Sequence, residues 1–298
     1  MADVSDPVPV TASAGVEFTD ADFDAVAELL RVDAGISLGP ENRQLVYSRL
    51  NRHVRGLGLV RFRDYLDRIR APGQEAERYR MVIALCTHTT RFFREGEHFD
   101  YLATEVMPRL SAQARSGGRV RLWSAGCSTG EEAYSIAATV LGAFPEAARH
   151  DVRVLGTDIS VEALATAQEG RYRDPGPTAV PDALRAVMFE PDPEPDHVVV
   201  TAAVRNLVTF RYLNFMEPWP LSGPFDAIFC RNVAIYMADD TQAHVWAGLE
   251  AVLGPEGTLF IGHSERLGPE FRDRLDLCGR TTFCRSTDPR LSSARRMQ

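Results

Sequence analysis

The sequence predicts an α/β protein with a doubly wound, mostly parallel sheet that follows an all-helical domain. From about Arg119, short β-branched or aromatic runs alternate with segments of helical character. Such alternation is typical of a parallel sheet with right-handed crossovers. Residues 17–90 contain no such runs and read as helices. With 298 residues, the chain is long enough for two domains.

The helical domain is expected to span 17–90, after a polar lead-in over 1–16 that we expect to be disordered. Asp20 can cap a first helix that runs through Leu30 and ends near Gly35. The other expected helices cover 40–54, 61–70 and 74–86.

In the sheet domain, expected over 119–285, four strands and three helices alternate. The expected strands are Val120–Ser124, Val152–Thr157, Phe225–Cys230 and Thr258–Gly262. The expected helices are Glu131–Phe144, Val161–Glu169 and Asp240–Leu253. Residues 91–118 form the linker and the start of this domain, Thr281–Arg285 is predicted as an antiparallel edge strand, and 286–298 form a tail.

Residues 172–212 interrupt the alternation with a Pro-rich loop, a short helix over 181–187 and two strand-like runs, Val198–Ala202 and Leu207–Tyr212. A simple strand-to-helix connection needs much less chain. We therefore expect a small inserted β-subdomain that binds a partner. The alternative is a long loop without a function of its own.

Composition excludes several classes of function. The net charge of −8 argues against general nucleic-acid binding. No apolar run is long enough to span a bilayer, and no secretory signal opens the sequence, which predicts the cytoplasm. The cysteines lack zinc spacing, so thiols that are buried or line a site are expected rather than disulfides or a metal site. These are Cys86, Cys127, Cys230, Cys278 and Cys284.

Basic charge concentrates in one part of this acidic chain. Residues 31–100 hold 13 Arg against 9 acidic residues. On the predicted helix over 40–54, one arc is apolar, and Arg49, Arg52 and Arg55 (the last just beyond the helix) fall on the opposite arc. These arginines either face an acidic partner or form a solvated surface.

The strongest chemical signal lies at residues 122–132, where a strand meets a helix through a turn of small residues. Such a turn lets the backbone approach a ligand closely. Glu131 and Glu132 open the helix, which disfavours a pyrophosphate and suits a ligand that carries an ammonium or sulfonium. Asp158 ends the next strand and can accept hydrogen bonds from a ribose diol. Alternatively, Asp158 is a helix N-cap and Glu131 a favourable helix-dipole charge.

Four segments resemble, in order, the motifs of the CheR family of chemotaxis receptor methyltransferases. They are Cys86–Glu95 (CTHTTRFFRE), Trp123–Glu132 (WSAGCSTGEE), Phe225–Tyr236 (FDAIFCRNVAIY) and Gly257–Glu265 (GTLFIGHSE). The resemblance covers residues 17–285. It implies a Rossmann-like fold, S-adenosylmethionine as cofactor and S-adenosylhomocysteine as product, with no metal.

The resemblance also implies roles for particular residues. The first motif would fold over the cofactor through His88, Thr90 and Arg94, and many family members carry Asn at the position of His88. Glu131 would bind the methionyl amino group and Asp158 the ribose. The rest of the cofactor site would comprise Gly126 in the turn, Asn214 and Phe215 around the adenine, and Cys230 and Arg231 as the floor.

The reaction that the resemblance implies is methyl transfer to glutamate side chains of chemoreceptors. A glutamate carboxylate is already ionised at neutral pH, so the enzyme needs alignment and desolvation rather than a general base. Arg94 would orient the carboxylate and Tyr236 would lie near the methyl. The basic helix would face the receptor's acidic methylation helices, and the inserted subdomain resembles a module that docks a receptor tail.

Other interpretations remain open from the sequence. Arg94 could pair with Glu95 or Glu97 on the surface, and Tyr236 could be a half-buried core aromatic. The chain could methylate a small molecule or another protein. It could also be an adaptor that binds S-adenosylmethionine without turnover.

Overall fold

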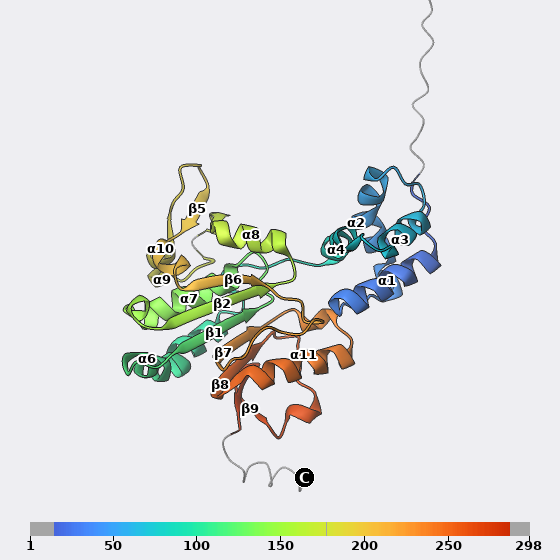
Figure 1. The fold of residues 1–298 in the computed structure, drawn as a ribbon. Helices are drawn as coiled ribbons and strands as arrows, with labels where there is room; N and C mark the ends of the chain where they lie inside the picture. The colour runs from blue at the N-terminus through green and yellow to red at the C-terminus, as the bar shows by residue number, and fades with distance from the viewer. Residues whose placement is uncertain (1–14, 177, 287–298) are drawn as a thin grey trace, which may run out of the picture. The chain divides into compact units, whose positions relative to one another are not determined.

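The computed structural model describes residues 15–176 and 178–286 (Figure 1). The chain divides into two compact units, one built from 15–33 and 37–86 and the other from 34–36 and the chain from Thr87 onward. The lead-in predicted over 1–16 and the tail predicted over 286–298 lie almost wholly outside the described residues.

The helical unit consists of four α-helices and a short 3-10 turn. They are α1 (Asp20–Ala34), η1 (Pro40–Asn42), α2 (Arg43–Gly56), α3 (Phe62–Arg70) and α4 (Glu75–Leu85). Val46, Leu50 and Val54 of α2 are fully buried, as their spacing along the helix predicts.

The N-cap predicted at Asp20 is wrong by one residue. Thr19 Oγ1 accepts a hydrogen bond from the Asp22 amide (3.2 Å), and the Asp22 carboxylate accepts one from the Thr19 amide (2.9 Å). This reciprocal pair is a capping box. Thr19 is the better cap because the Asp22 carboxylate, three residues on, also accepts a hydrogen bond from the Thr19 amide.

The second unit is built on a seven-stranded sheet of order β6-β2-β1-β7-β8-β10-β9. Five strands are parallel and β9 and β10 are antiparallel, so the predicted doubly wound sheet is confirmed. The strands are β1 (Val120–Ala125), β2 (Val152–Asp158), β6 (Val208–Tyr212), β7 (Phe225–Cys230), β8 (Leu253–Ile261), β9 (Leu275–Gly279) and β10 (Thr282–Arg285). The predicted final strand exists as β10, but β9 lies outside it and forms the edge.

Helices cover both faces of the sheet, and alternate strand residues point into two cores. Leu122 faces the core shared with α6, α7 and α8, whereas Trp123 faces the core shared with α11. The helices and short helical turns that accompany the main sheet are α5 (Glu97–Tyr101), the π-helical turn η2 (Leu102–Val106), α6 (Met107–Arg115), α7 (Glu131–Ala143), η3 (Ala147–Arg149), α8 (Val161–Glu169), η4 (Ala234–Tyr236), α11 (Asp239–Val252) and η5 (Pro269–Phe271).

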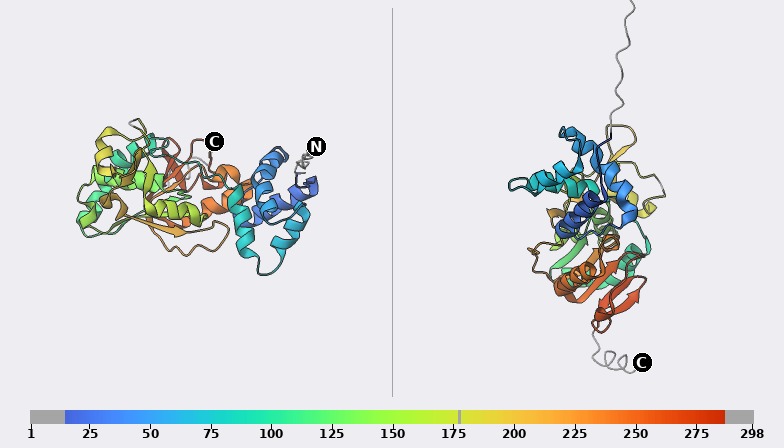
Figure 2. Two further views of the ribbon diagram at one scale, coloured as in Figure 1. Left: turned by 90° about the horizontal axis from the view of Figure 1, so that it is seen from above. Right: turned by 90° about the vertical axis from the view of Figure 1, so that its right-hand side faces the viewer.

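A small antiparallel sheet of order β3-β5-β4 forms the inserted subdomain (Figure 1, Figure 2). Its elements are β3 (Arg171–Arg173), α9 (Asp182–Met188), β4 (Phe189–Pro191), β5 (His197–Val200) and α10 (Ala202–Arg205). The assignment of Leu207–Tyr212 to this subdomain is wrong, because this run is β6 and pairs in parallel with β2 at the edge of the main sheet. An alternating pattern predicts a strand but does not say which sheet it joins.

The expectation of free thiols is wrong for one pair of cysteines. Cys278 and Cys284 form a disulfide between β9 and β10, with their Cα atoms 6.1 Å apart. Cys127 and Cys230 are buried thiols and Cys86 is half-buried. No helix among the described residues is long and apolar enough to cross a membrane.

Leu122 is fully buried in the core beneath α7, so Leu122→Ala should lower the free energy of unfolding of the sheet unit by about 3 kcal/mol. All three tryptophans (Trp123, Trp219 and Trp246) lie in this unit, so tryptophan fluorescence during urea unfolding reports on it selectively. Leu277→Ala is the matched control, since Leu277 is 66% exposed and should change stability by less than about 0.5 kcal/mol. Equal effects of the two substitutions would contradict this packing.

Candidate functional site

The predicted site residues of the sheet unit gather at the carboxyl ends of its parallel strands. From β1 the chain proceeds to β2 and β6 on one side, and β7 and β8 lie on the other side. The carboxyl end of β1 is therefore a topological switch point, where open α/β sheets bind ligands.

The turn from β1 to α7 is held in an unusual conformation. Gly126 and Gly130 have φ values of 85° and 97°, and Ser128 has a φ of 50°. The amides of Gly126 and Cys127 both donate to the Thr157 carbonyl at 2.8 Å. These bonds fix the turn against the end of β2.

Asp158 closes β2 and faces this turn. Its carboxylate accepts hydrogen bonds from the amides of Ser128 (2.7 Å) and Ser160 (2.9 Å). The alternative of an N-cap is wrong, because Ser160 caps α8 by accepting from the Ala163 amide. Burial raises the pKa of Asp158, and these backbone donors offset only part of that effect, so a further donor from a ligand would stabilise the ionised form.

His88 lies close to Asp158, and the electrostatic interaction between them lowers the pKa of that carboxyl, against the larger effect of burial. The His88 carbonyl accepts from Ser128 Oγ (2.9 Å), which fixes this segment over the turn. His88 Nε2 is buried and has no hydrogen-bond partner among the described residues. A buried polar atom without a partner is usually satisfied by a ligand or a water molecule. Thr90, two residues further on, is half-buried.

Glu131 opens α7 with a carboxylate that no arginine or histidine of the described chain neutralises. Its Oε2 accepts from Thr129 Oγ1 (2.7 Å), and burial raises its pKa. A half-buried carboxylate that has lost much of its solvation and has no cation suits a ligand that supplies one. Its place at the helix start is compatible with the helix-dipole interpretation as well.

Asn214 and Phe215 follow β6, beside the end of β2. Asn214 is buried, and its Oδ1 accepts from the Met216 amide (3.0 Å). Phe215 is buried against Trp219, with ring centroids 5.5 Å apart. Both side chains are therefore held by contacts with neighbouring residues.

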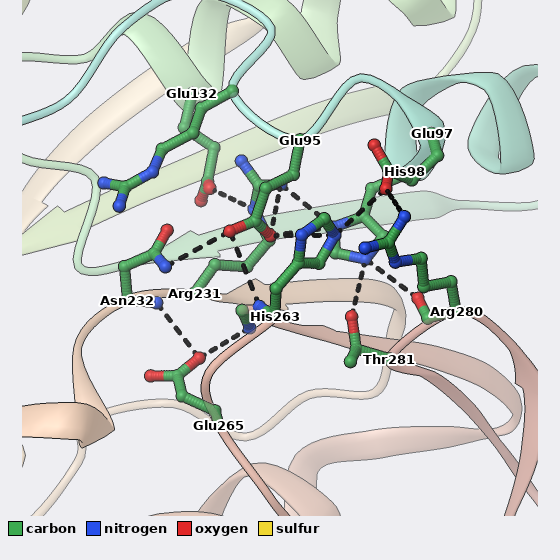
Figure 3. A network of polar contacts seen from close by, with 12 residues as sticks. Glu95, Glu97, His98, Glu132, Arg231, Asn232, His263, Glu265, Arg280 and Thr281 are labelled. Carbon is green, nitrogen blue, oxygen red and sulfur yellow. Dashed lines mark hydrogen bonds and ion pairs between the residues drawn. The ribbon is translucent and has the colours of Figure 1, made fainter.

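Cys230 ends β7 in the interior, and Arg231 follows it directly. Burial raises the pKa of the Cys230 thiol well above its usual range. The Arg231 side chain is 1% exposed, and its Nε donates to Glu132 (2.8 Å). Its Nη1 donates to His98 Nδ1 (2.9 Å) and reaches Glu95 at 3.4 Å (Figure 3). We call Arg231, Glu132, Glu95 and His98 the Arg231 cluster.

His98 enters this cluster as a neutral ring. Burial, and then the charge of Arg231, lower the pKa of His98 to about 4. Its Nδ1 must be unprotonated to accept from Arg231, so Nε2 carries the proton and donates to the Arg280 carbonyl (3.0 Å). Glu95, His98 and His263 bring potential metal-ligand atoms within 4.8 Å of one another, but the Arg231 guanidinium already contacts two of these three groups. We interpret the cluster as an ion-pair network.

Sequence reasoning missed Glu265, which fixes the loops after β7 and β8. Its carboxylate accepts from the amides of Asn232 (3.0 Å), Val233 (2.9 Å), Ala234 (2.8 Å) and Gly262 (2.5 Å). The only signal was its place in the fourth motif, because nothing local predicts three donors from the distant loop after β7 beside the nearby Gly262 amide.

Arg94 and Tyr236 both reach the surface of this region. Arg94 is half-buried, and its Nη1 donates to the Thr89 carbonyl (3.1 Å). In the described chain it pairs with neither Glu95 nor Glu97, so the surface ion pair is not formed. Tyr236 is 39% exposed and belongs to neither apolar core.

The three arginines of α2 differ in their surroundings. Arg52 and Arg55 are exposed. Arg49 Nη1 donates to the carbonyls of Leu85 (2.7 Å) and Cys86 (3.0 Å). Arg49 thus caps the carboxyl end of α4, a role that its helical spacing could not reveal.

The fold is Rossmann-like, and its switch point presents the carboxylates of Glu131 and Asp158. This combination is typical of methyltransferases, whose cofactor is a cationic nucleoside. Residues 88–284 match the family model of the CheR methyltransferase SAM-binding domain, and 21–85 match its all-alpha domain.

Among curated relatives, a probable chemotaxis protein methyltransferase of Rhizobium etli is 44% identical over 84% of this chain and 94% of its own. The chemotaxis protein methyltransferases of Salmonella typhimurium and Escherichia coli are 39% and 37% identical, each over 91% of this chain and 92% of theirs. The chain belongs to the CheR family and is an S-adenosylmethionine-dependent methyltransferase.

A Cβ added to Gly126 would lie 2.5 Å from Val233 Cγ2, at a φ that disfavours side chains. Gly126→Ala should therefore destabilise the sheet unit by about 2–4 kcal/mol, from backbone strain and overpacking together. Adding Val233→Ala should recover the steric part only, beyond what Val233→Ala does alone. Additive effects in this cycle, followed by tryptophan fluorescence, would refute the close approach.

Proposed function

We propose that this protein transfers the methyl group of S-adenosylmethionine to glutamate side chains of methyl-accepting chemotaxis receptors and forms methyl esters. The supporting observation is Arg94, a half-buried cation that no carboxylate of the described chain neutralises. It lies on a segment anchored to the switch point through His88 and Ser128. Such a cation suits a substrate carboxylate.

The cofactor would be held by the buried polar groups of the switch point. Glu131 would accept from its amino group, Asp158 from its ribose, and His88 Nε2 would gain the partner that it lacks among the described residues. Thr90 would lie over the cofactor. Cys230 and Arg231 would form the floor, Gly126 would lie in the turn beside the cofactor, and Asn214 and Phe215 would frame the adenine.

The cofactor supplies an already activated methyl group on a sulfonium. The protein's own residues then need only to align and desolvate the carboxylate. Arg94 would orient the substrate carboxylate, and Tyr236 would lie beside the reacting centre. Arg94 would contribute by positioning the carboxylate, because binding that is equally strong in the ground state and the transition state gives no acceleration.

We assign receptor recognition to two surfaces and place the enzyme in the cytoplasm, where receptor methylation helices lie. Exposed Arg52 and Arg55 extend the basic face of α2 and would steer acidic helices by charge. Arg49 would contribute its charge from its capping position. The β3-β5-β4 sheet would dock a receptor tail.

The reaction is tested with labelled S-adenosylmethionine and membranes that contain chemoreceptors of the same organism. We expect label on a receptor-sized band that alkali releases as volatile methanol, the signature of a carboxyl methyl ester. Arg94→Ala should lower the rate about 100-fold and cofactor affinity less than about threefold. Arg91→Ala, in the same segment and exposed, is the matched control.

Tight cofactor binding without any transfer would favour the sensing adaptor. Alkali-stable label, or label confined to other molecules, would favour a different substrate.

The Glu131 carboxylate predicts how cofactor affinity depends on pH. Burial raises its pKa above the ordinary 4.5, and only the ionised form attracts an ammonium. Affinity should therefore fall as the pH drops through this raised pKa, and binding there should release protons, measurable by calorimetry in buffers of different ionisation enthalpy. Glu131→Gln should cost about tenfold in affinity at pH 7 and make the profile shallower, since Asp158 remains.

The control Glu169→Gln alters an exposed carboxylate at the far end of α8 and should change neither affinity nor profile. An unchanged profile in Glu131→Gln would remove Glu131 from the cofactor site.

A further inference from the structure

The carboxylate of Glu95 joins three segments that are distant in sequence (Figure 3). Its Oε1 accepts from Asn232 Nδ2 (3.2 Å), after β7, and from the His263 amide (3.5 Å), after β8. Its Oε2 accepts from Arg231 Nη1 (3.4 Å). Glu95 itself follows Arg94 directly, so these contacts hold residues 92–96, which we call the Arg94 turn, against both loops.

The backbone on both sides of these contacts is strained. Phe93 and Glu95 have φ values of 50° and 58°, and Asn232 has a φ of 59°. Non-glycine residues keep such conformations only where surrounding contacts determine them, and they concentrate at functional sites. Glu95 and Glu265 together supply these contacts, since Asn232 donates its side chain to one and its amide to the other.

We propose that Glu95 is a positioning residue, which sets the place of Arg94 relative to the loop that carries Tyr236. This inference rests on the proposed function, in which Arg94 orients the substrate carboxylate. Glu95 acts through its neighbours and touches no reacting atom.

The donors around Glu95 require a carboxylate. Both oxygens accept, one from a guanidinium and the other from an amide side chain and a backbone N–H. Glutamine has a single acceptor oxygen, so its NH₂ group must face a donor of either Arg231 or Asn232. Glu95→Gln therefore breaks one arm of the arrangement while it preserves the volume.

Three variants separate positioning from mere structure: Glu95→Gln, Glu95→Ala and the control Glu97→Gln. Glu97 follows two residues on, as the first residue of α5. It contacts His263 Nε2 (3.1 Å) and Arg280 (3.0 Å), but its side chain is 39% exposed. For each full-length variant we would measure kcat on receptor membranes, Kd for S-adenosylhomocysteine, the thermal midpoint, and hydrogen exchange of the 89–97 segment.

In Glu95→Gln we expect kcat to fall about 10- to 100-fold, since small misplacements carry costs of this size. Kd should stay within about threefold, the midpoint should hardly move, and amides of 89–97 should exchange at least about tenfold faster. Glu95→Ala should show larger effects of the same kind, and Glu97→Gln should match the parent within about twofold in every readout.

Unchanged kcat and exchange in Glu95→Gln would overturn the proposal. A rise in Kd that equals the fall in kcat would overturn it too, since Glu95 would then serve cofactor binding. If the parent protein labels no receptor, the proposed function fails, and the exchange of 89–97 still decides whether Glu95 holds this turn.

Discussion

A buried arginine between two carboxylates is the interaction on which the carboxyl edge of the sheet depends. Moving a guanidinium from water to the interior costs several kcal/mol, and only well-placed partners offset that cost. Arg231 has these partners in Glu132, Glu95 and His98, which come from α7, the Arg94 turn and α5. The pairing therefore ties three segments to the end of β7.

The protonation of the cluster follows from the same charge. Burial, and next the charge of Arg231, lower the pKa of His98 to about 4, so its ring is neutral at neutral pH and acts as an acceptor. Two carboxylates then face one guanidinium. Glu131 and Asp158, whose pKa values burial raises, add two further carboxyl groups at this edge of the sheet. The acidic groups thus outnumber the Arg231 guanidinium, as a site for a cofactor with a sulfonium and an ammonium requires.

Local patterns in the sequence predicted much of this protein. The β7 and α8 boundaries agree with the expected ranges, and β1 and β2 each extend one residue further, because alternation and strand-to-helix turns are local signals. The motifs also placed Asp158 and Glu131 at one edge, since parallel strands end together.

Long-range contacts were beyond such patterns. The sheet that Leu207–Tyr212 joins, the disulfide of Cys278 with Cys284, and the cap that Arg49 gives to α4 all depend on partners brought together by folding. Glu95 and Glu265 show the same limit most clearly. Each is a single acidic residue in a motif. The donors that make it important come from the loop after β7, more than 30 positions away in the sequence.

The most direct test is a double-mutant cycle between Arg231 and Glu132, followed by tryptophan fluorescence in urea. Arg231→Met and Glu132→Gln should each lower the free energy of unfolding of the sheet unit by about 3–5 kcal/mol, because each leaves a buried group unpaired. The double variant should be more stable than the sum predicts by at least about 1.5 kcal/mol. Losses that add within about 0.5 kcal/mol would show that the two residues act independently and would contradict a central role for the Arg231 cluster.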